Sequence, residues 1–251
     1  MPKETYIFQR IEKKYLITVE QKSDLLSELE RHIHGDEYGV STICSAYLDT
    51  PDFRIIRNSI DATDYKEKLR LRSYGKAEQN KTVFLEIKKK YHKRVYKRRI
   101  AVKYNEAINY IYRGTKPCDS QIMHEIDYAM RFYDHPLPQA IICYEREAFY
   151  AKDLPAFRIT FDTNIRYRRE TIDLTKPTSG KLILPKGKVI MEIKTDGAMP
   201  LWMSNILDSR EIFPTSFSKY GTAYQMFSKE NISYDSAAYY CPDSVSLAAA
   251  N

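Results

Sequence analysis

Four segments of the chain alternate charged and apolar residues with a period of two: residues 10–14, 66–72, 83–90 and 189–194. Alternate residues of an extended strand point to the same face, so each segment has one charged face and one apolar face. Arg is frequent on these faces, and its planar guanidinium suits phosphate groups. The residue types therefore predict a site for a polyanion such as a chain of phosphates.

The distribution of charge favours the same chemistry. The chain has 40 Lys and Arg against 33 Asp and Glu, a net charge of +7. Residues 66–103 hold 15 Lys or Arg and 3 acidic residues, a net of +12, so the remaining residues sum to −5. Such a concentration on a mildly acidic protein indicates a polyanion site. The alternative is a solvated, lysine-rich sheet edge that discourages strand pairing.

Several other chemistries have no motif in the sequence. It has no GxxxxGK[ST] or GxGxxG loop for a nucleotide, no HExxH metal motif and no GxSxG nucleophile elbow. The four cysteines form no CxxC pair, which argues against a zinc ribbon. If phosphates bind, side chains rather than a glycine loop must hold them.

The elements that would position these residues are mostly strands. Alternation predicts strands at about 6–16, 42–49, 54–60, 64–74, 82–90, 94–103, 140–151, 156–168, 181–185 and 188–194. Capping signals predict helices at about 18–34, 106–112, 120–133, 200–209 and 216–229, the first opened by Thr18 and Gln21. We expect one α+β domain over residues 1–230, mainly antiparallel, and a loosely packed tail at 231–251. Charged faces on several strands are explained by a closed barrel with a charged lumen and peripheral helices.

The motifs Arg10-x-Glu12-x-Lys14, Lys68-x-Arg70-x-Arg72, Glu86-x-Lys88 and Glu192-x-Lys194, in this order, resemble the triphosphate tunnel metalloenzyme (CYTH-like) superfamily. Within it, the chain is most similar to the polyphosphate polymerase (VTC) domain in a short, stand-alone form, from about residue 7 to 227. The resemblance implies a tunnel of eight antiparallel strands, with basic side chains around a triphosphate or phosphate chain. It also implies a carboxylate-bound Mn²⁺ or Mg²⁺.

The resemblance assigns roles to individual residues. The phosphate-binding, catalytic positions would be Lys14, Arg70, Arg72, Lys88, Arg146, Arg158 and Lys219. Further substrate-binding positions would be Lys97, Arg10, Tyr144, Lys194 and Lys68, although the run 97–99 offers three candidates for the first of these. Glu192 and Glu12 would be the metal ligands. Asp162 would be either a second metal ligand or an orienting partner for an arginine.

The implied activity is transfer of the ATP γ-phosphate to a growing inorganic polyphosphate. Hydrolase and cyclase members open with Glu-x-Glu-x-Lys, whereas this chain has Arg10 at the first position, which favours the polymerase. The alternatives are a tunnel triphosphatase acting on inorganic or nucleoside triphosphate, and a non-catalytic polyphosphate-binding accessory module. The expected partners are ATP, polyphosphate or triphosphate, and no nucleic acid. We expect a cytoplasmic protein, with a separate membrane protein as a candidate partner that would hold it at the inner face of a membrane.

Overall fold

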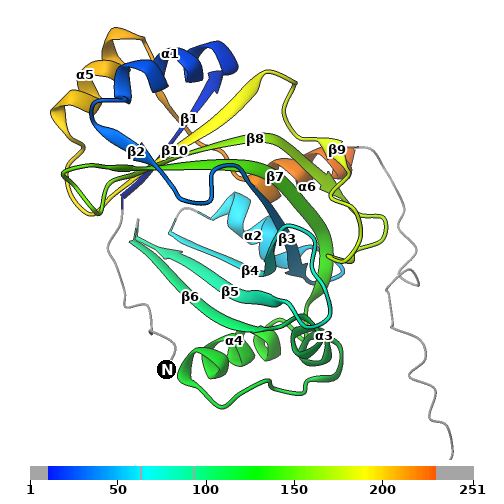
Figure 1. Ribbon diagram of the computed structural model, residues 1–251. Coiled ribbons are helices and arrows are strands. Elements are labelled where there is room, and N and C mark those ends of the chain that lie inside the picture. Colours follow the sequence, from blue (N-terminus) through cyan, green and yellow to red (C-terminus); the bar gives the residue numbers. More distant parts are fainter. Residues whose placement is uncertain (1–10, 63, 93, 230–251) are drawn as a thin grey trace, which may run out of the picture.

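The computed structural model describes residues 11–62, 64–92 and 94–229, which form an antiparallel sheet and six helices (Figure 1). The strands are β1 (Ile11–Thr18), β2 (Ile33–Gly35), β3 (Ser41–Asp49), β4 (Tyr65–Tyr74), β5 (Thr82–Tyr91), β6 (Arg94–Lys103), β7 (Leu137–Ala151), β8 (Arg158–Arg168), β9 (Lys181–Leu182), β10 (Lys188–Thr195) and β11 (Pro214–Thr215). The helices are α1 (Val19–Leu29), α2 (Arg54–Asp61), α3 (Tyr104–Arg113), α4 (Gln121–Phe132), α5 (Leu201–Ser209) and α6 (Lys219–Lys229). The predicted class, α+β with mainly antiparallel strands, is confirmed.

The prediction of a closed, eight-stranded barrel is wrong. The sheet has eleven strands in the order β11-β1-β10-β8-β7-β3-β4-β5-β6, with β2 paired to β7 and β9 to β8. In the described part of the chain, β6 pairs only with β5, and the free side of β1 pairs with the short β11 at Lys14 and Tyr15. β11 thus takes the backbone positions of Lys14 and Tyr15 on that edge, and β6 forms no ladder with β1 in the described residues.

Side chains bridge the two ends of this curved sheet where the backbone does not. The Nζ atom of Lys88, on β5, lies 2.7 Å from Oε2 of Glu12, on β1. These strands stand far apart in the order of the sheet, so the sheet curves strongly enough to bring its two ends together. Its concave side carries the charged faces predicted from the sequence, and we call this side the charged lumen.

Apolar residues on the convex side pack under two helix pairs (Figure 1). Helices α3 and α4 cover one core with strands β3 to β7, and α1 and α5 cover another with β1, β8 and β10. On β5, Val83, Leu85 and Ile87 are buried in the first of these cores, whereas Glu86 points to the lumen. The alternation predicted for this strand is therefore confirmed.

Helices α2 and α6 form a third core on the concave side, with residues that include Tyr47, Ile142 and Ile190. Tyr220 of α6 stacks on Tyr47 with ring centroids 4.5 Å apart. These helices fill one end of the lumen with apolar side chains. The start of α6 is thereby held against the charged part of the lumen.

Residues 54–60, predicted as a strand, form α2 instead. The buried Asp49 carboxylate accepts hydrogen bonds from the backbone N–H groups of Ile55 and Ile56 at 2.8 and 3.0 Å. It thus satisfies N–H groups that a helix start leaves without partners. The paired isoleucines suggested a strand, but the helix is fixed by a carboxylate at the end of β3.

The helix ends follow local signals elsewhere. Thr18 and Gln21 form the predicted capping box of α1, which ends at Leu29 because the chain then enters β2. Ser120 caps α4, and its hydroxyl oxygen accepts from the Met123 N–H at 3.2 Å. At α6, Ser218 rather than Ser216 accepts from the backbone, through Gly221 N–H at 3.0 Å. Among the described helices, none combines the length and the apolar character needed to cross a membrane. Arg10 and the predicted tail 231–251 lie outside the described residues.

Candidate functional site

The charged lumen contains many more cations than carboxylates. Its cations are Lys14, Lys68, Arg70, Arg72, Lys88, Lys97, Arg99, Arg146, Arg158, Lys194 and Lys219. Its carboxylates are Glu12, Asp36, Glu86, Asp162 and Glu192. Eleven formal positive charges against five negative ones leave an excess of six among the described residues. A concave surface of one sign focuses the field and attracts anions.

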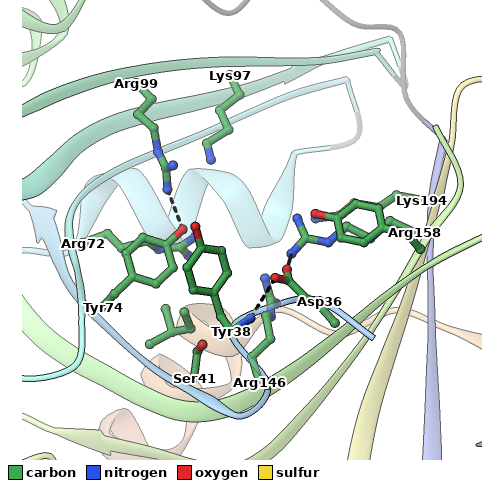
Figure 2. Close-up of a pocket in the computed structure, with 14 residues that line it drawn as sticks. Asp36, Tyr38, Ser41, Arg72, Tyr74, Lys97, Arg99, Arg146, Arg158 and Lys194 are labelled. Carbon is green, nitrogen blue, oxygen red and sulfur yellow. Dashed lines mark hydrogen bonds and ion pairs between the residues drawn. The ribbon is translucent and has the colours of Figure 1, made fainter. Parts of the chain in front are cut away.

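A cavity of about 560 Å³ opens onto this lumen (Figure 2). Six of the cations line it: Arg72, Lys97, Arg99, Arg146, Arg158 and Lys194. They come from β4, β6, β7, β8 and β10, so they surround the space rather than forming a flat patch. The arrangement suits an elongated polyanion contacted from several directions.

One buried carboxylate, Glu86, holds three of the cations in place. Its Oε2 accepts from Arg70 Nε at 2.7 Å, and its Oε1 accepts from Arg99 Nε at 2.6 Å and lies 2.9 Å from Lys97 Nζ. Burial alone would raise the pKa of Glu86, but the surrounding cations, Arg70 foremost, hold it well below its usual range. Glu86 is therefore ionised, and it orients side chains that could bind phosphate.

Asp162 plays the same part on the other wall. Arg146 donates to both of its oxygens, at 2.6 and 2.7 Å, and Lys219 Nζ lies 2.5 Å from Oδ2. This geometry supports the second of the two roles considered for Asp162, an orienting partner for an arginine. It also shows how α6 contributes: Lys219, the first residue of the helix, reaches the lumen as expected.

Glu192 differs from these two carboxylates. Its contacts with Arg146 and Lys194 are both 3.7 Å long, and among the described residues it makes no hydrogen bond. Burial alone would raise its pKa, but Lys194, Lys14 and Arg146 keep the pKa of Glu192 well below its usual range. An ionised, buried carboxylate without close donors is available to a ligand.

The neighbour of Glu192 across the sheet is also unsatisfied. Thr160 is its register partner on β8 and is fully buried, yet Thr160 Oγ1 has no hydrogen-bond partner within the described ranges. Arg158 Nε, two residues away on the same face, is likewise buried without a partner. Buried polar groups are nearly always hydrogen-bonded, so these atoms mark a place that a polar ligand or an ion would fill.

The donor set here fits a hard divalent cation. Mg²⁺ and Mn²⁺ accept carboxylate oxygens, and such ions are often held by one or two carboxylates with phosphate oxygens and water. Glu192 supplies one available carboxylate, whereas Glu12 is engaged with Lys88. In the described part of the chain, no cluster of three or more His, Cys, Asp or Glu side chains could hold a metal alone. The arrangement therefore suits an ion shared with phosphate.

Burial among like charges changes the lysines of the lumen. Burial is the largest effect and lowers the pKa of Lys68 and of Lys97 to about 7, and that of Lys14 to about 8. Lys68 Nζ donates to Ser218 Oγ and Lys14 Nζ to the carbonyl of Phe217, each at 2.7 Å. Glu86 beside Lys97 and Glu192 near Lys14 favour the charged forms, but burial outweighs them, and phosphate would supply further negative charge.

The structure brings together every predicted site residue except Arg10, which lies outside the described residues. Tyr144 lies among them: Arg72 Nη2 is 3.4 Å from its hydroxyl, and Lys219 Nζ is 4.5 Å from its ring centroid. Of the three candidates at 97–99, two reach the lumen, because Arg98 points away to Glu125 of α4 at 2.8 Å. Their roles in binding and catalysis belong to the proposal below.

The sequence analysis left Arg99 open among the three candidates at 97–99, missed Ser218, and gave Glu86 no defined role. Arg99 could have been found from strand alternation, since it shares the face of Lys97. Ser218 accepts from Lys68 across 150 residues of sequence, so only the tertiary structure shows that contact.

Comparison with known families identifies the family of this chain. The family model described as the VTC domain matches residues 9–228. The chain belongs to the VTC domain family. This confirms the resemblance to the triphosphate tunnel metalloenzyme superfamily. Members of this wider group are enzymes that act on phosphates and generally use divalent metals. Among curated protein sequences, none matched the chain.

Solved structures resemble the chain at low sequence identity. A proposed adenylate cyclase from Bacillus halodurans is 13% identical and superposes with a TM-score of 0.53, covering 87% of this chain and 98% of its own. A second proposed adenylate cyclase, from Vibrio parahaemolyticus, is 11% identical with a TM-score of 0.45, covering 87% of this chain and 99% of its own. The first of these likenesses supports the fold of this VTC domain and says nothing of its substrate.

Proposed function

We propose that this VTC domain is a metal-dependent polyphosphate polymerase that transfers the γ-phosphate of ATP to a growing inorganic polyphosphate chain. The observation that carries the proposal is the concentration of basic side chains along one lumen, with eleven formal positive charges against five negative ones. A single ATP triphosphate has about four negative charges, and an acceptor chain adds more. At 4 Å, two unit charges at an effective dielectric near 20 interact by about 4 kcal/mol. Donor and acceptor could meet only where cations offset this repulsion.

The transfer needs few proton movements. A terminal oxygen of the acceptor chain attacks the γ-phosphorus, the bond from that phosphorus to the β-bridging oxygen breaks, and ADP leaves with the electron pair. The attacking oxygen is already anionic, so no general base is required. A divalent metal would stabilise charge on the phosphate oxygens when bound. Glu192 would hold it, with Thr160 beside it.

The state of the carboxylates argues against the triphosphatase alternative. Water is a poor nucleophile, and a general base works best with a pKa near the operating pH. The pKa values of Glu86, Asp162 and Glu192 are all lowered: burial would raise each, but the cations beside them prevail. These three carboxylates are therefore poorly suited to activate water as general bases, whereas a terminal phosphate oxygen needs no such base.

The other lumen residues would bind and orient. Arg70, Arg72 and Lys97 would contact phosphates from one wall, and Arg146 and Lys219 from the other. Phosphoryl transfer depends mainly on such positioning and charge neutralisation. Because most of these side chains are held by Glu86 or Asp162, little rearrangement would be needed when substrate arrives.

The test is an incubation of the purified protein with ATP and Mn²⁺, in which product length on a gel and the ratio of ADP to free phosphate are both measured. We expect a polyphosphate ladder with ADP and little free phosphate. The double variant Arg70→Ala, Arg72→Ala should lose the ladder. Free phosphate without a ladder would establish the triphosphatase. Polyphosphate binding without turnover would leave the accessory module as the function.

A further inference from the structure

The rim of the 560 Å³ cavity differs in chemistry from its interior. Cations line much of the cavity, and Tyr38, Tyr74 and Tyr150 line it as well; Tyr38 and Tyr74 are labelled in Figure 2. Tyr38 is 72% exposed and Tyr74 is 52% exposed. Phosphates alone give no reason for tyrosine rings at the mouth of a cationic cavity. Aromatic rings with accessible faces are what a nucleobase stacks on.

The segment that carries Tyr38 is held in a defined turn. Asp36 N–H donates to the carbonyl of Ala148 at 2.8 Å, and Gly39 N–H donates to the carbonyl of Asp36 at 3.2 Å. Gly39 has a φ of 53°, a left-handed conformation that glycine adopts without strain. The Tyr38 N–H donates to Oδ1 of Asp36 at 3.2 Å. The ring is therefore placed at the rim by its backbone rather than by packing of its own.

The same turn is tied to the phosphate-binding wall. Asp36 Oδ2 lies 3.5 Å from Arg158 Nη2, and the Arg158 guanidinium lies 5.0 Å from the ring centroid of Tyr150. On the opposite rim, Arg99 Nη2 donates to the hydroxyl of Tyr74 at 3.1 Å. At both sides of the opening, a tyrosine is thus in contact with a cation that would face the phosphates.

We infer that this opening is the nucleoside end of the lumen, where the base of the donor nucleoside triphosphate stacks on Tyr38 and Tyr74. The inference rests on the proposed function, since it places the ATP donor. With the base at the rim, the triphosphate extends inward past Arg72 and Arg146. The acceptor chain then occupies the part of the lumen around Lys14, Lys68 and Lys88.

Stacking also defines the ligand class. Every base has a π face, so stacking favours a nucleotide over inorganic triphosphate without selecting one base strongly. Comparing two ligands that both contain a triphosphate therefore distinguishes binding at the rim from binding in the interior of the cavity. A non-hydrolysable ATP analogue reports on rim and interior together, and inorganic tripolyphosphate reports on the interior alone.

The experiment is calorimetric titration of both ligands into the full chain, in one Mg²⁺ buffer. Tyr38→Ala and Tyr74→Ala should each weaken the ATP analogue by about fivefold or more, and should change tripolyphosphate affinity by less than about twofold. Tyr74→Phe keeps the ring and loses only the hydroxyl that accepts from Arg99, so it should bind the analogue more tightly than Tyr74→Ala does. Tyr128→Ala is the matched control, because Tyr128 is 61% exposed on α4 and does not line the cavity.

Each of the remaining binding outcomes contradicts the inference. Unchanged analogue affinity in both alanine variants overturns the inference, and so does parallel weakening of both ligands, which would indicate a general loss of the site. Binding of tripolyphosphate without the analogue by the wild type overturns the inference and leaves a tripolyphosphate-binding role standing. If the wild type binds neither ligand, the proposed function fails as well. Unfolding temperatures, expected to match the wild type, show whether the variants fold.

Discussion

The three most buried carboxylates of the lumen differ in what their oxygens already bind. Asp162 accepts three hydrogen bonds from Arg146 and Lys219, and Glu86 is surrounded by cations at 2.6 to 2.9 Å. Glu192 has only contacts of 3.7 Å within the described residues. The three groups are all carboxylates, but Asp162 and Glu86 orient cations of the lumen, whereas Glu192 is available to bind a metal ion. The difference comes from which cations reach each position.

Glu192→Gln keeps the size of the side chain and removes its charge. We expect metal-dependent turnover to fall by at least the roughly 10–100-fold that loss of an outer-shell metal partner costs. Tripolyphosphate binding without metal should be retained, because the basic side chains remain. The measurements are turnover against Mn²⁺ concentration, and titration of tripolyphosphate in chelator.

The control is Glu147→Gln. Glu147 lies on β7 beside Arg146 but points to the opposite face, where it pairs with Lys22 of α1. This variant should behave like the wild type in both assays. Wild-type turnover in Glu192→Gln would show that the metal binds elsewhere.

The lysines should give phosphate binding a characteristic pH dependence. Burial lowers the pKa of Lys68 and Lys97 to about 7, so these groups lose their protons as the pH rises above 7. A bound phosphate favours the charged form, so binding above pH 7 takes up protons. Affinity for tripolyphosphate should therefore fall between pH 7 and 9, by up to about tenfold per pH unit for each lysine.

Proton uptake is measured by calorimetry in buffers of different ionisation enthalpy. The terminal phosphates of tripolyphosphate also lose protons as the pH rises, which adds negative charge and acts in the opposite direction, so the profile is compared with that of a variant that binds the same ligand. Arginine keeps its charge across this pH range, so Lys68→Arg should make the fall in tripolyphosphate affinity with pH less steep, while Lys97 still contributes. A flat profile in the wild type would contradict the lowered pKa values.

At the scale of the element, β5 supplies the residue that organises three cations from its two neighbouring strands. Glu86 contacts Arg70 on β4 and Lys97 and Arg99 on β6. The three strands thus form a rigid basic wall. A wall built in this way can hold more positive charge than unpaired lysines and arginines could, because the carboxylate offsets their mutual repulsion.

Glu86→Gln distinguishes positioning from simple charge. Removing a negative charge raises the potential of the lumen, so a purely Coulombic role predicts tighter tripolyphosphate binding. We expect turnover to fall and binding to weaken instead, because Arg70 and Arg99 lose their orienting partner. Breaking a buried ion pair costs about 3–5 kcal/mol of unfolding free energy. Denaturant unfolding with and without tripolyphosphate measures this loss, which the ligand should partly restore. Tighter binding with full activity would disprove the positioning role.

At the scale of the whole molecule, the open seam between β1 and β6 is the main structural feature. Within the described ranges, the seam is spanned by side chains, such as the Lys88–Glu12 pair, rather than by a backbone ladder. A polyanion in the lumen would contact cations on both sides of the seam. It would then join the two ends of the sheet that the backbone leaves apart.

Hydrogen exchange should show this coupling. In the free protein, amides of β6 should exchange faster than those of β3 and β7, which have ladder partners on both sides. Tripolyphosphate should slow exchange in β1 and β6 by more than in α3, which lies on the convex side. Equal protection across the chain would instead indicate global stabilisation by mass action.

The sequence by itself determined the family, the antiparallel class and which residues of the charged strands share a face. Period-two alternation shows which residues share a face, so Glu86 and Lys88, or Glu192 and Lys194, could be assigned to the lumen without a structure. Capping boxes are equally local, and the start of α1 followed from Thr18 and Gln21. These features depend on residues a few positions apart, where backbone geometry is the same in every fold.

Only the tertiary structure decided how the faces meet. The described sheet stays open between β6 and β1, whose edge pairs with β11 at Lys14 and Tyr15, and the start of α2 depends on Asp49 reaching the backbone of Ile55 and Ile56. The different contacts of Glu86, Asp162 and Glu192 are likewise set by partners from distant strands and from α6. Such contacts depend on strand order and curvature, and local alternation contains neither.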